Sequence, residues 1–104
     1  AVIAYADGKA AGMANCFEGF STFKCKPLIN IHDLAVSPHF RGKGVSKHLL
    51  NKIREIAVEK DCCKLTLEVL QGNTIAKQAY VNYGFEAYEL DPKLGQALFW
   101  EMTL

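Results

Sequence analysis

Two absences limit what this chain can be: it has no long hydrophobic run and no excess of charge of one sign. No apolar run in its 104 residues approaches the roughly 18–20 residues that a helix needs to span a bilayer. Lys and Arg number 12 and Asp and Glu number 11, so the formal net charge is +1. No global field therefore draws the chain to nucleic acid or to a membrane, and we expect neither as a partner. The length and the 50% hydrophobic content predict a single globular domain over residues 1–104.

Metal-binding and redox cysteine patterns are also absent. There is no CxxC pair, no nearby His completes a zinc pattern, and two of the cysteines are adjacent, a poor geometry for an ordinary disulfide. Asp7 and Gly8 interrupt the first apolar run and no basic leader precedes it, so we do not expect a signal peptide. We expect no metal site and a cytoplasmic location, with reduced thiols at Cys16, Cys25, Cys62 and Cys63.

The order of the apolar patterns predicts an α+β domain built on one mixed sheet. Strands are expected over residues 2–6, 9–17, 28–36, 64–70, 85–90 and 96–104. Helices are expected over residues 44–60 and between a cap at Asn73 or Thr74 and Gly84. Asp7-Gly8 predicts a two-residue hairpin, and residues 18–27 are expected to form a loop or bulge. The central strand, helix and strand imply a parallel pair with a right-handed crossover. The predicted fold class is thus a mixed, mostly antiparallel sheet around a parallel β-α-β unit, with helices packed on it in a three-layer α/β arrangement.

Apolar stripes indicate which faces of these elements are buried. The stripe of the first helix is formed by Val45, Leu49, Ile53, Ile56 and Ala57. The second helix, with Asn73 or Thr74 as its N-cap and Gly84 at its C-terminal end, has a stripe of Ile75, Ala76, Ala79, Tyr80 and Tyr83. In the strand over residues 64–70, one face is formed by Leu65, Leu67 and Val69 and the other by Thr66 and Glu68.

A glycine-rich basic turn links the strand that ends at Val36 to the first helix. The turn contains Arg41-Gly42-Lys43-Gly44-Val45-Ser46. Such a turn directs several backbone N–H groups and the positive end of a helix dipole to one point, which favours a phosphate. It is neither a Walker loop nor the dinucleotide fingerprint, which would need a glycine at Lys47. Taken alone, the turn is also compatible with a strand–helix connection that binds nothing.

A second pattern lies downstream, at Asn73, Ala76, Tyr80, Gly84 and Phe85. Together with the turn, it resembles the GNAT superfamily of N-acetyltransferases, which transfer an acetyl group from acetyl-CoA to an amine. The family's pyrophosphate loop reads Arg/Gln-x-x-Gly-x-Gly/Ala, and this chain departs from it only in having Ser46 at the last small position. The family usually begins with a strand and two helices before the first hairpin. The resemblance thus implies an N-terminally short domain that lacks part of the acceptor pocket.

The resemblance also assigns the cosubstrate, acetyl-CoA, to particular residues. Backbone N–H groups of the turn would bind the pyrophosphate, basic side chains would add charge, and the end of the preceding strand would pair with pantetheine and polarise the acetyl carbonyl. Asn73 would contact the pantetheine arm, cap its helix, or both. The implied cofactor-binding residues are Leu34, Ala35, Val36, Arg41, Gly42, Lys43, Gly44, Val45, Ser46, Lys47, Asn73, Ala76 and Tyr80. For Lys47, a solvated position on the helix surface is the alternative.

Two residues are implied as catalytic for direct transfer in a ternary complex. Tyr80 falls at the position of the family's general acid, which would protonate the departing CoA thiolate. Glu68 is the first choice for the base that frees the amine, since its spacing from Tyr80 resembles that of the ribosomal-protein branch of the family. The alternatives are a core aromatic for Tyr80 and a structural or solvent-facing carboxylate for Glu68. His32 and Asp33 are expected on opposite strand faces, so at most one of them faces the site.

Other functions remain compatible with the sequence. A non-catalytic acyl-CoA-binding module is the main alternative, because acceptor-side elements of the family are not found. A nucleic-acid-binding domain would use Arg41, Lys43, Lys47, Lys52 and Arg54, but the near-neutral charge and the lack of interleaved aromatics argue against it. The sequence does not identify the amine acceptor. A homodimer is expected if the strand over residues 2–6 is an exposed sheet edge.

Overall fold

The computed structural model describes residues 1–21, 24–86, 89–91, 93, 95–96 and 100–104. The chain forms two compact units, Ala1–Glu68 and Val69–Leu104, here called the first and the second unit and described separately. The expectation of one domain over residues 1–104 stays a prediction. In the described part of the chain, neither helix has the length and apolar content needed to cross a membrane.

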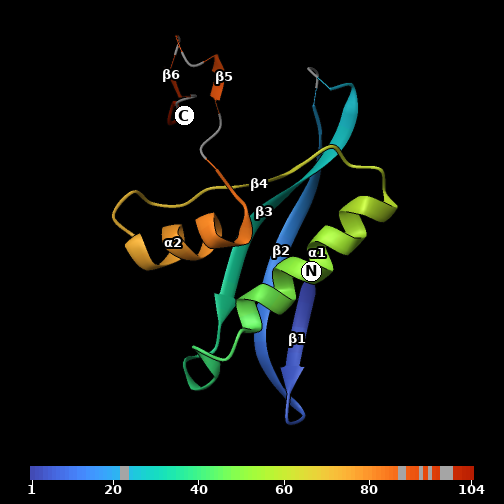
Figure 1. The fold of residues 1–104 in the computed structure, drawn as a ribbon, viewed down its shortest axis with the longest axis vertical. Helices are drawn as coiled ribbons and strands as arrows, with labels where there is room; N and C mark the ends of the chain where they lie inside the picture. Colours follow the sequence, from blue (N-terminus) through green and yellow to red (C-terminus); the bar gives the residue numbers. More distant parts are fainter. Residues whose placement is uncertain (22–23, 87–88, 92, 94, 97–99) are drawn as a thin grey trace. The chain divides into compact units, whose positions relative to one another are not determined.

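The first unit is built on a four-stranded sheet in the order β1-β2-β3-β4. Its strands are β1 (Val2–Ala6), β2 (Lys9–Ser21), β3 (Lys26–Val36) and β4 (Leu65–Leu67). The first three pair antiparallel, whereas β3 and β4 are parallel (Figure 1). The predicted mixed sheet with a central parallel β-α-β unit is therefore confirmed.

The β1–β2 hairpin is the one that the sequence predicts. Asp7 and Gly8 have φ values of 53° and 75°, and both central residues of a tight type I′ turn need such positive angles. The loop predicted over residues 18–27 is wrong at both ends, since β2 continues to Ser21 and β3 begins at Lys26. Cross-strand pairing extends to Ser21 opposite Lys26, and this long ladder outweighs the local turn signals of a single glycine and proline.

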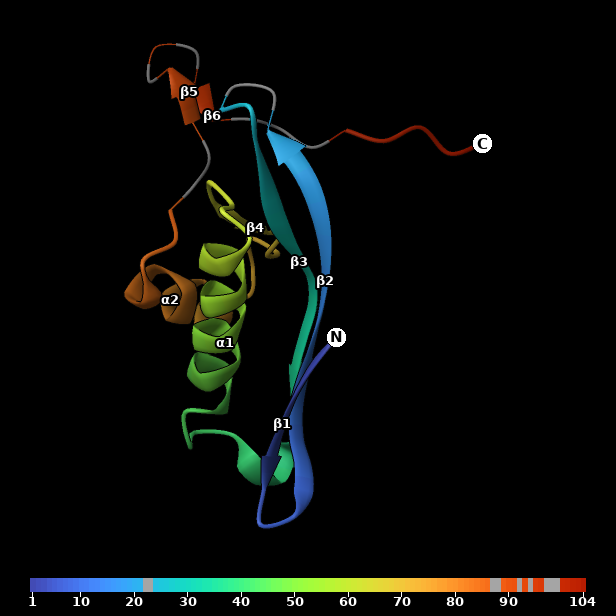
Figure 2. The same ribbon diagram turned by 90° about the vertical axis from the view of Figure 1, so that its right-hand side faces the viewer.

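Helix α1 (Val45–Glu59) covers one face of β1, β2 and β3 (Figure 2). It begins after a glycine-rich turn, as the sequence predicts, and the short 3-10 helix η1 (Pro38–Phe40) before that turn is an element that the sequence does not predict. Its buried side chains are Val45, Leu49, Leu50, Ile53 and Ala57, so the predicted stripe is correct except that Leu50 replaces Ile56, which is half-buried. Beneath the helix, the sheet contributes Ala11, Ala14, Ile29 and Ile31 to the core.

Gly12 lies at the closest approach of β2 to α1. A Cβ atom at this position would lie 2.9 Å from Val45 Cγ1 and 2.9 Å from the Ala35 carbonyl oxygen. Both distances are shorter than ordinary van der Waals contact, so glycine allows the first turn of α1 to sit directly on the sheet.

Strand β4 is shorter than the sequence predicts. The alternating pattern extends over residues 64–70, but only Leu65–Leu67 pair with β3. Val69 and Leu70 are 39% and 81% exposed, so the predicted face of Leu65, Leu67 and Val69 does not continue beyond Leu67. Alternation alone does not fix how many residues find a partner strand.

The second unit contains α2 (Thr74–Tyr83), which follows Asn73, one of the two predicted caps, and ends before Gly84 as predicted. The Asn73 side-chain oxygen accepts a hydrogen bond from the Ala76 N–H at 3.2 Å, as an N-cap does. Gly84 has a φ of 124° and follows the last helical residue. The predicted stripe is wrong at Ile75, which is 85% exposed, and at Ala79, which is also exposed. Helical spacing identifies the stripe but not the part of it that another element covers.

A small antiparallel pair, β5 (Glu89–Asp91) and β6 (Gly95–Gln96), follows α2. The sequence predicts this pairing but makes both strands longer, over residues 85–90 and 96–104. Residues 85–86 and 100–104 lie outside any strand. Residues 87–88 and 97–99, which belong to the same predictions, lie outside the described residues.

Candidate functional site

The turn between β3 and α1 has the backbone of an anion-binding loop. The Ser37 N–H donates to the Ala11 carbonyl at 2.7 Å and the Phe40 N–H donates to the Ser37 carbonyl at 2.9 Å, which fixes the start of the connection. Gly42 and Gly44 then adopt φ values of 77° and 78°. Side-chain-bearing residues rarely adopt these left-handed angles, so the two glycines shape the turn.

The first turn of α1 presents unused backbone donors. Gly44 is the N-cap, no side chain caps the helix, and the first backbone bond joins the His48 N–H to the Gly44 carbonyl at 3.1 Å. An α-helix has no internal acceptor for its first N–H groups, which here belong to Val45, Ser46 and Lys47. These groups and the helix dipole favour an anion at this end of α1.

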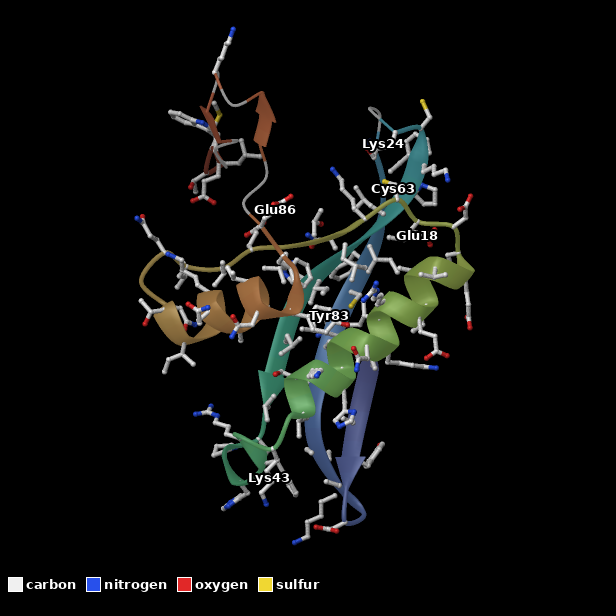
Figure 3. All side chains as sticks on the ribbon, in the orientation of Figure 1. Glu18, Lys24, Lys43, Cys63, Tyr83 and Glu86 are labelled. Atoms are coloured by element: carbon white, nitrogen blue, oxygen red, sulfur yellow. The ribbon has the colours of Figure 1, made fainter. Side chains whose placement is uncertain are left out.

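Basic side chains surround these donors. Arg41, Lys43 and Lys47 are all exposed, and the Lys43 Nζ lies 5.6 Å from the centre of the Phe40 ring. None of the three forms an ion pair within the described residues, whereas Lys60 at the other end of α1 pairs with Glu18 at 3.7 Å. Figure 3 shows Lys43 and Glu18 at opposite ends of the helix. Uncompensated positive charge is therefore concentrated at the glycine-rich turn.

A β-bulge in β3 changes which way its last residues point. Asn15 pairs with Asp33 while the next residue, Cys16, pairs with Ile31, so His32 is one residue more than the ladder needs. Ile31 is buried and Leu34 packs against the core under α1. His32 and Asp33 between them therefore both lie on the opposite face, and both are exposed.

This placement corrects the expectation that His32 and Asp33 lie on opposite faces. Strict alternation along a strand leads to that expectation, and a bulge breaks the alternation. On the exposed face, the His32 ring meets the Phe17 ring edge-on with centres 5.5 Å apart. The sequence contains no local signal for the bulge. The grouping of Phe17, His32 and Asp33 on one face could therefore not be predicted.

The end of β3 has an unpaired edge in the first unit. β4 pairs only with Ile29–Ile31, and no strand of the described residues pairs with β3 beyond that point on this side. Because the Ser37 N–H bonds to β2, alternation directs the backbone groups of Leu34 and Val36 away from β2, toward the open side. These are residues that the resemblance assigns to pantetheine, and their free N–H and C=O groups are available to a ligand.

Glu68 follows β4 directly and is exposed. The sequence predicts it within a strand, but the strand ends one residue earlier, at Leu67. Just before it, the Asn30 side-chain amide donates to Thr66 Oγ1 at 2.9 Å and ties β3 to β4. Glu68 is thus a solvated carboxylate at the end of the parallel pair and the last residue of the first unit.

In the second unit, the downstream motif is gathered on α2 and its ends. Tyr80 is half-buried and contacts Phe85 edge-on, with ring centres 5.9 Å apart. The Phe85 N–H donates to the Tyr80 carbonyl at 2.9 Å. Burial raises the pKa of the Tyr80 phenol above its ordinary value, so the hydroxyl keeps its proton at neutral pH. A protonated phenol can act as a proton donor.

The described residues contain no group of three or more His, Cys, Asp and Glu side chains that could hold a metal ion.

The residues implied for acetyl-CoA fall into two sets, one in each unit. The first unit holds Leu34–Val36 and Arg41–Lys47, which are close in sequence and joined through η1. The second unit holds Ala76 and Tyr80 on α2 and Asn73 at its N-cap.

Comparisons with known proteins agree with this fold. The sequence profile of the acetyltransferase (GNAT) family matches residues 1–85. An uncharacterized N-acetyltransferase of Archaeoglobus fulgidus is 35% identical over 82 residues, which cover 78% of this chain and 56% of the relative. A thialysine N-epsilon-acetyltransferase of Bos taurus is 35% identical over 65 residues, covering 62% of this chain and 38% of the relative. The chain therefore spans about half or less of the length of these relatives.

A solved structure of an acetyltransferase has the same fold as this chain. The aminoglycoside N-acetyltransferase AAC(6')-Iy, in complex with CoA, superposes with a TM-score of 0.78 at 27% identity. The match covers 98% of this chain and 74% of that protein. The arrangement of strands and helices is thus shared along nearly the whole chain.

Proposed function

Because the chain belongs to the acetyltransferase (GNAT) family, we propose that it moves an acetyl group from acetyl-CoA to a primary amine by direct transfer in a ternary complex. One observation carries this proposal: the basic turn with unused helix N–H groups is joined, through η1, to a strand end whose backbone is unpaired. The first feature suits the phosphates of CoA and the second suits its amide-containing arm.

The turn binds the pyrophosphate in this proposal. Backbone N–H groups from Gly42 to Ser46 donate to phosphate oxygens, and the dipole of α1 adds to the attraction. Arg41, Lys43 and Lys47 contribute positive charge. The complex of AAC(6')-Iy with CoA supports CoA as the ligand of the family's fold.

The end of β3 holds the pantetheine arm and the thioester. The outward backbone groups of Leu34 and Val36 bond to the amides of the arm, and Asn73 and Ala76 contribute from α2. A main-chain N–H near Leu34 to Val36 polarises the acetyl carbonyl and stabilises the oxyanion that forms when the amine attacks.

Proton transfers complete the reaction. An alkyl amine has a pKa of about 10 and must lose a proton before it attacks. Glu68 is the proposed base, because it is a solvated carboxylate at the end of the parallel strands. Tyr80 is the proposed acid that protonates the CoA thiolate, and its raised pKa keeps the phenol ready to donate.

We also propose a cytoplasmic location and a homodimer. The location rests on the cysteine pattern, which predicts reduced thiols. The dimer rests on β1, which stands at the edge of the four-stranded sheet and offers unpaired backbone groups to a second copy. Sedimentation velocity on the chain tests the dimer, and a monomer at all concentrations would refute it.

The test of the function is a titration of this chain with acetyl-CoA by calorimetry, followed by thiol release with a panel of amines. Binding together with amine-dependent thiol release supports the proposal. Binding without release from any amine would assign the non-catalytic acyl-CoA-binding module instead. An absence of binding would refute the assignment of the turn and the strand end to CoA in this chain.

A further inference from the structure

We propose that the sheet face opposite α1 is the contact surface of a homodimer, in which an apolar patch of one copy packs on the same patch of a second copy. The patch consists of Ile3 and Tyr5 on β1 and of Met13 and Phe17 on β2. The contact involves neither acetyl-CoA nor an acceptor, so it goes beyond the proposed function and is tested without it.

The pattern of β1 places its part of the patch on the face that α1 does not cover. Val2, Ala4 and Ala6 pack against the core cluster beneath α1. Ile3 and Tyr5 alternate with them and are exposed, so these two side chains point to the opposite face. Figure 2 shows α1 on one side of the sheet only.

The pattern of β2 does the same for its two members of the patch. A Cβ atom at Gly12 would meet side chains of α1, and Ala14 is fully buried, so Met13 between them points away from the helix. Glu18 forms an ion pair with the C-terminal end of α1, so its neighbour Phe17 also points away. All four side chains of the patch therefore share one face.

The exposed area of the patch is close to what a stable dimer needs. Its four side chains are between 37% and 68% exposed, and Ile3 lies directly opposite Met13. Since an aromatic side chain has about 150–250 Å² of surface, the patch exposes about 400 Å² of apolar area. A standard interface takes about 800 Å² from each partner, and somewhat more than half of it is apolar. Two copies of the patch thus supply the apolar core of such an interface.

The charges of this face favour a second copy and set its orientation. Within β1 and β2, no residue that points to this face is charged, so two packed patches bring no like charges together. The acidic groups lie to one side, at Asp33 on β3 and at Glu68, which the parallel register places beside His32. A two-fold axis that runs along β1 and β2 carries the acidic groups of the two copies to opposite sides of the contact. The two sheets then pack face to face, as in a β-sandwich.

A dimer through the edge of β1 would be a different assembly. Edge pairing joins backbone N–H and C=O groups, whereas the face contact joins side chains. Met13 and Phe17 lie on β2, which has β1 on one side and β3 on the other. Substitutions at these two positions therefore test the face and leave the edge of β1 unchanged.

The experiment is sedimentation velocity over a range of protein concentrations, with Met13→Glu as the first test variant. The variant would bury one carboxylate from each copy in the contact, so we expect the Kd of the dimer to rise about a hundredfold or more. Phe17→Ser, which adds no charge, should raise it about tenfold. The matched control is Val58→Glu, because Val58 is an exposed apolar residue on α1. Val58→Glu should keep the wild-type Kd.

Two further measurements keep the test decisive. Thermal unfolding shows whether each variant is folded, and if Met13→Glu is not, Phe17→Ser takes its place. In the wild-type chain, the methyl NMR signals of Ile3 and Met13 should shift as the protein concentration rises. The methyl signals of Ile53, which is buried beneath α1, should not.

The outcomes that would overturn the contact are distinct. A wild-type chain that is monomeric at all concentrations would refute both the face contact and the edge dimer. A dimer that survives unchanged in the folded variants at Met13 and Phe17 would assign the association to the edge of β1 instead. Equal weakening in Val58→Glu would show that added charge, rather than its place on this face, disrupts the dimer. Failure of the acetyl-CoA titration would refute the proposed function and leave these results unaffected.

Discussion

At the scale of the residue, the glycine-rich turn depends on the left-handed angle of Gly44, which has a φ of 78°. We predict that Gly44→Glu abolishes acetyl-CoA binding, because it adds a carboxylate beside the N–H groups proposed to hold the pyrophosphate. The left-handed angle also costs a side-chain-bearing residue about 1–2 kcal/mol of folding stability. Calorimetry measures the binding, and thermal unfolding measures the stability.

Gly8 provides a matched control for this variant. It has a φ of 75° in the β1–β2 hairpin, and, as at Gly44, no atom lies within 4 Å of the point that a Cβ would occupy. Gly8→Glu should therefore cost similar stability and leave acetyl-CoA binding intact. If both variants bind acetyl-CoA equally, the turn does not hold the pyrophosphate.

The second residue-scale prediction concerns Tyr80. If its phenol protonates the CoA thiolate, Tyr80→Phe should lower kcat by about a hundredfold or more and leave the acetyl-CoA Kd unchanged. Because burial raises the pKa of Tyr80, the phenol stays protonated through neutral pH. The wild-type rate should therefore fall only at a pH above the ordinary range of a tyrosine phenol, and the pH–rate profile of the variant should lack that fall.

Tyr83 on the same helix is the control for Tyr80. It is half-buried as well, and the resemblance gives it no role in the chemistry. Tyr83→Phe should retain kcat. An equal loss in both variants would mean that α2 needs its tyrosines for packing rather than for proton transfer.

At the scale of the element, the position of α1 on the sheet depends on Gly12. Gly12→Ala would place a Cβ atom 2.9 Å from the Ala35 carbonyl oxygen and 2.9 Å from Val45 Cγ1. The backbone oxygen cannot move cheaply, so we predict that the free energy of unfolding falls by about 1–3 kcal/mol. Urea unfolding measures it. The acetyl-CoA affinity should also fall, because the first turn of α1, which contains Val45, must shift away from β2.

The control for this prediction is Gly19, on the same strand. A Cβ atom at Gly19 would meet only the Leu28 side chain, at 3.3 Å, and a leucine methyl group can rotate aside. Gly19→Ala should change the stability by no more than about 0.5 kcal/mol. A similar loss in both variants would show that strand flexibility, not the close approach of α1, sets the cost.

The elements that the sequence predicts are those with local signals. The Asp7-Gly8 turn and the ends of α1 and α2 are set by glycine angles, a capping asparagine and helical periodicity, and all appear as expected. The extension of β2 to Ser21 and the early end of β4 depend on partner strands distant in sequence. The bulge at His32 depends on the pairing of β3 with β2. The sequence alone therefore predicted His32 and Asp33 on opposite faces of the strand.

At the scale of the whole molecule, a net charge of +1 conceals an uneven distribution. Lys26 and Lys60 pair with Asp61 and Glu18 near the C-terminal end of α1, whereas Lys43 near its N-terminal end has no ion pair among the described residues (Figure 3). The attraction for a phosphate ligand is thus local and, since the charges are exposed, is screened within about 10 Å at moderate salt.

This distribution predicts the salt dependence of cosubstrate binding. The Kd for acetyl-CoA should rise with ionic strength, and Lys43→Gln should weaken binding by up to about fivefold at low salt and make the salt dependence shallower. Lys60→Gln removes the same charge from the other end of the helix and should change neither. Calorimetry over a range of salt concentrations measures both effects. Only a local field distinguishes two lysines at opposite ends of one helix. Identical salt dependence in Lys43→Gln and Lys60→Gln would therefore mean that the net charge of the chain, rather than the charge at the turn, attracts the cosubstrate.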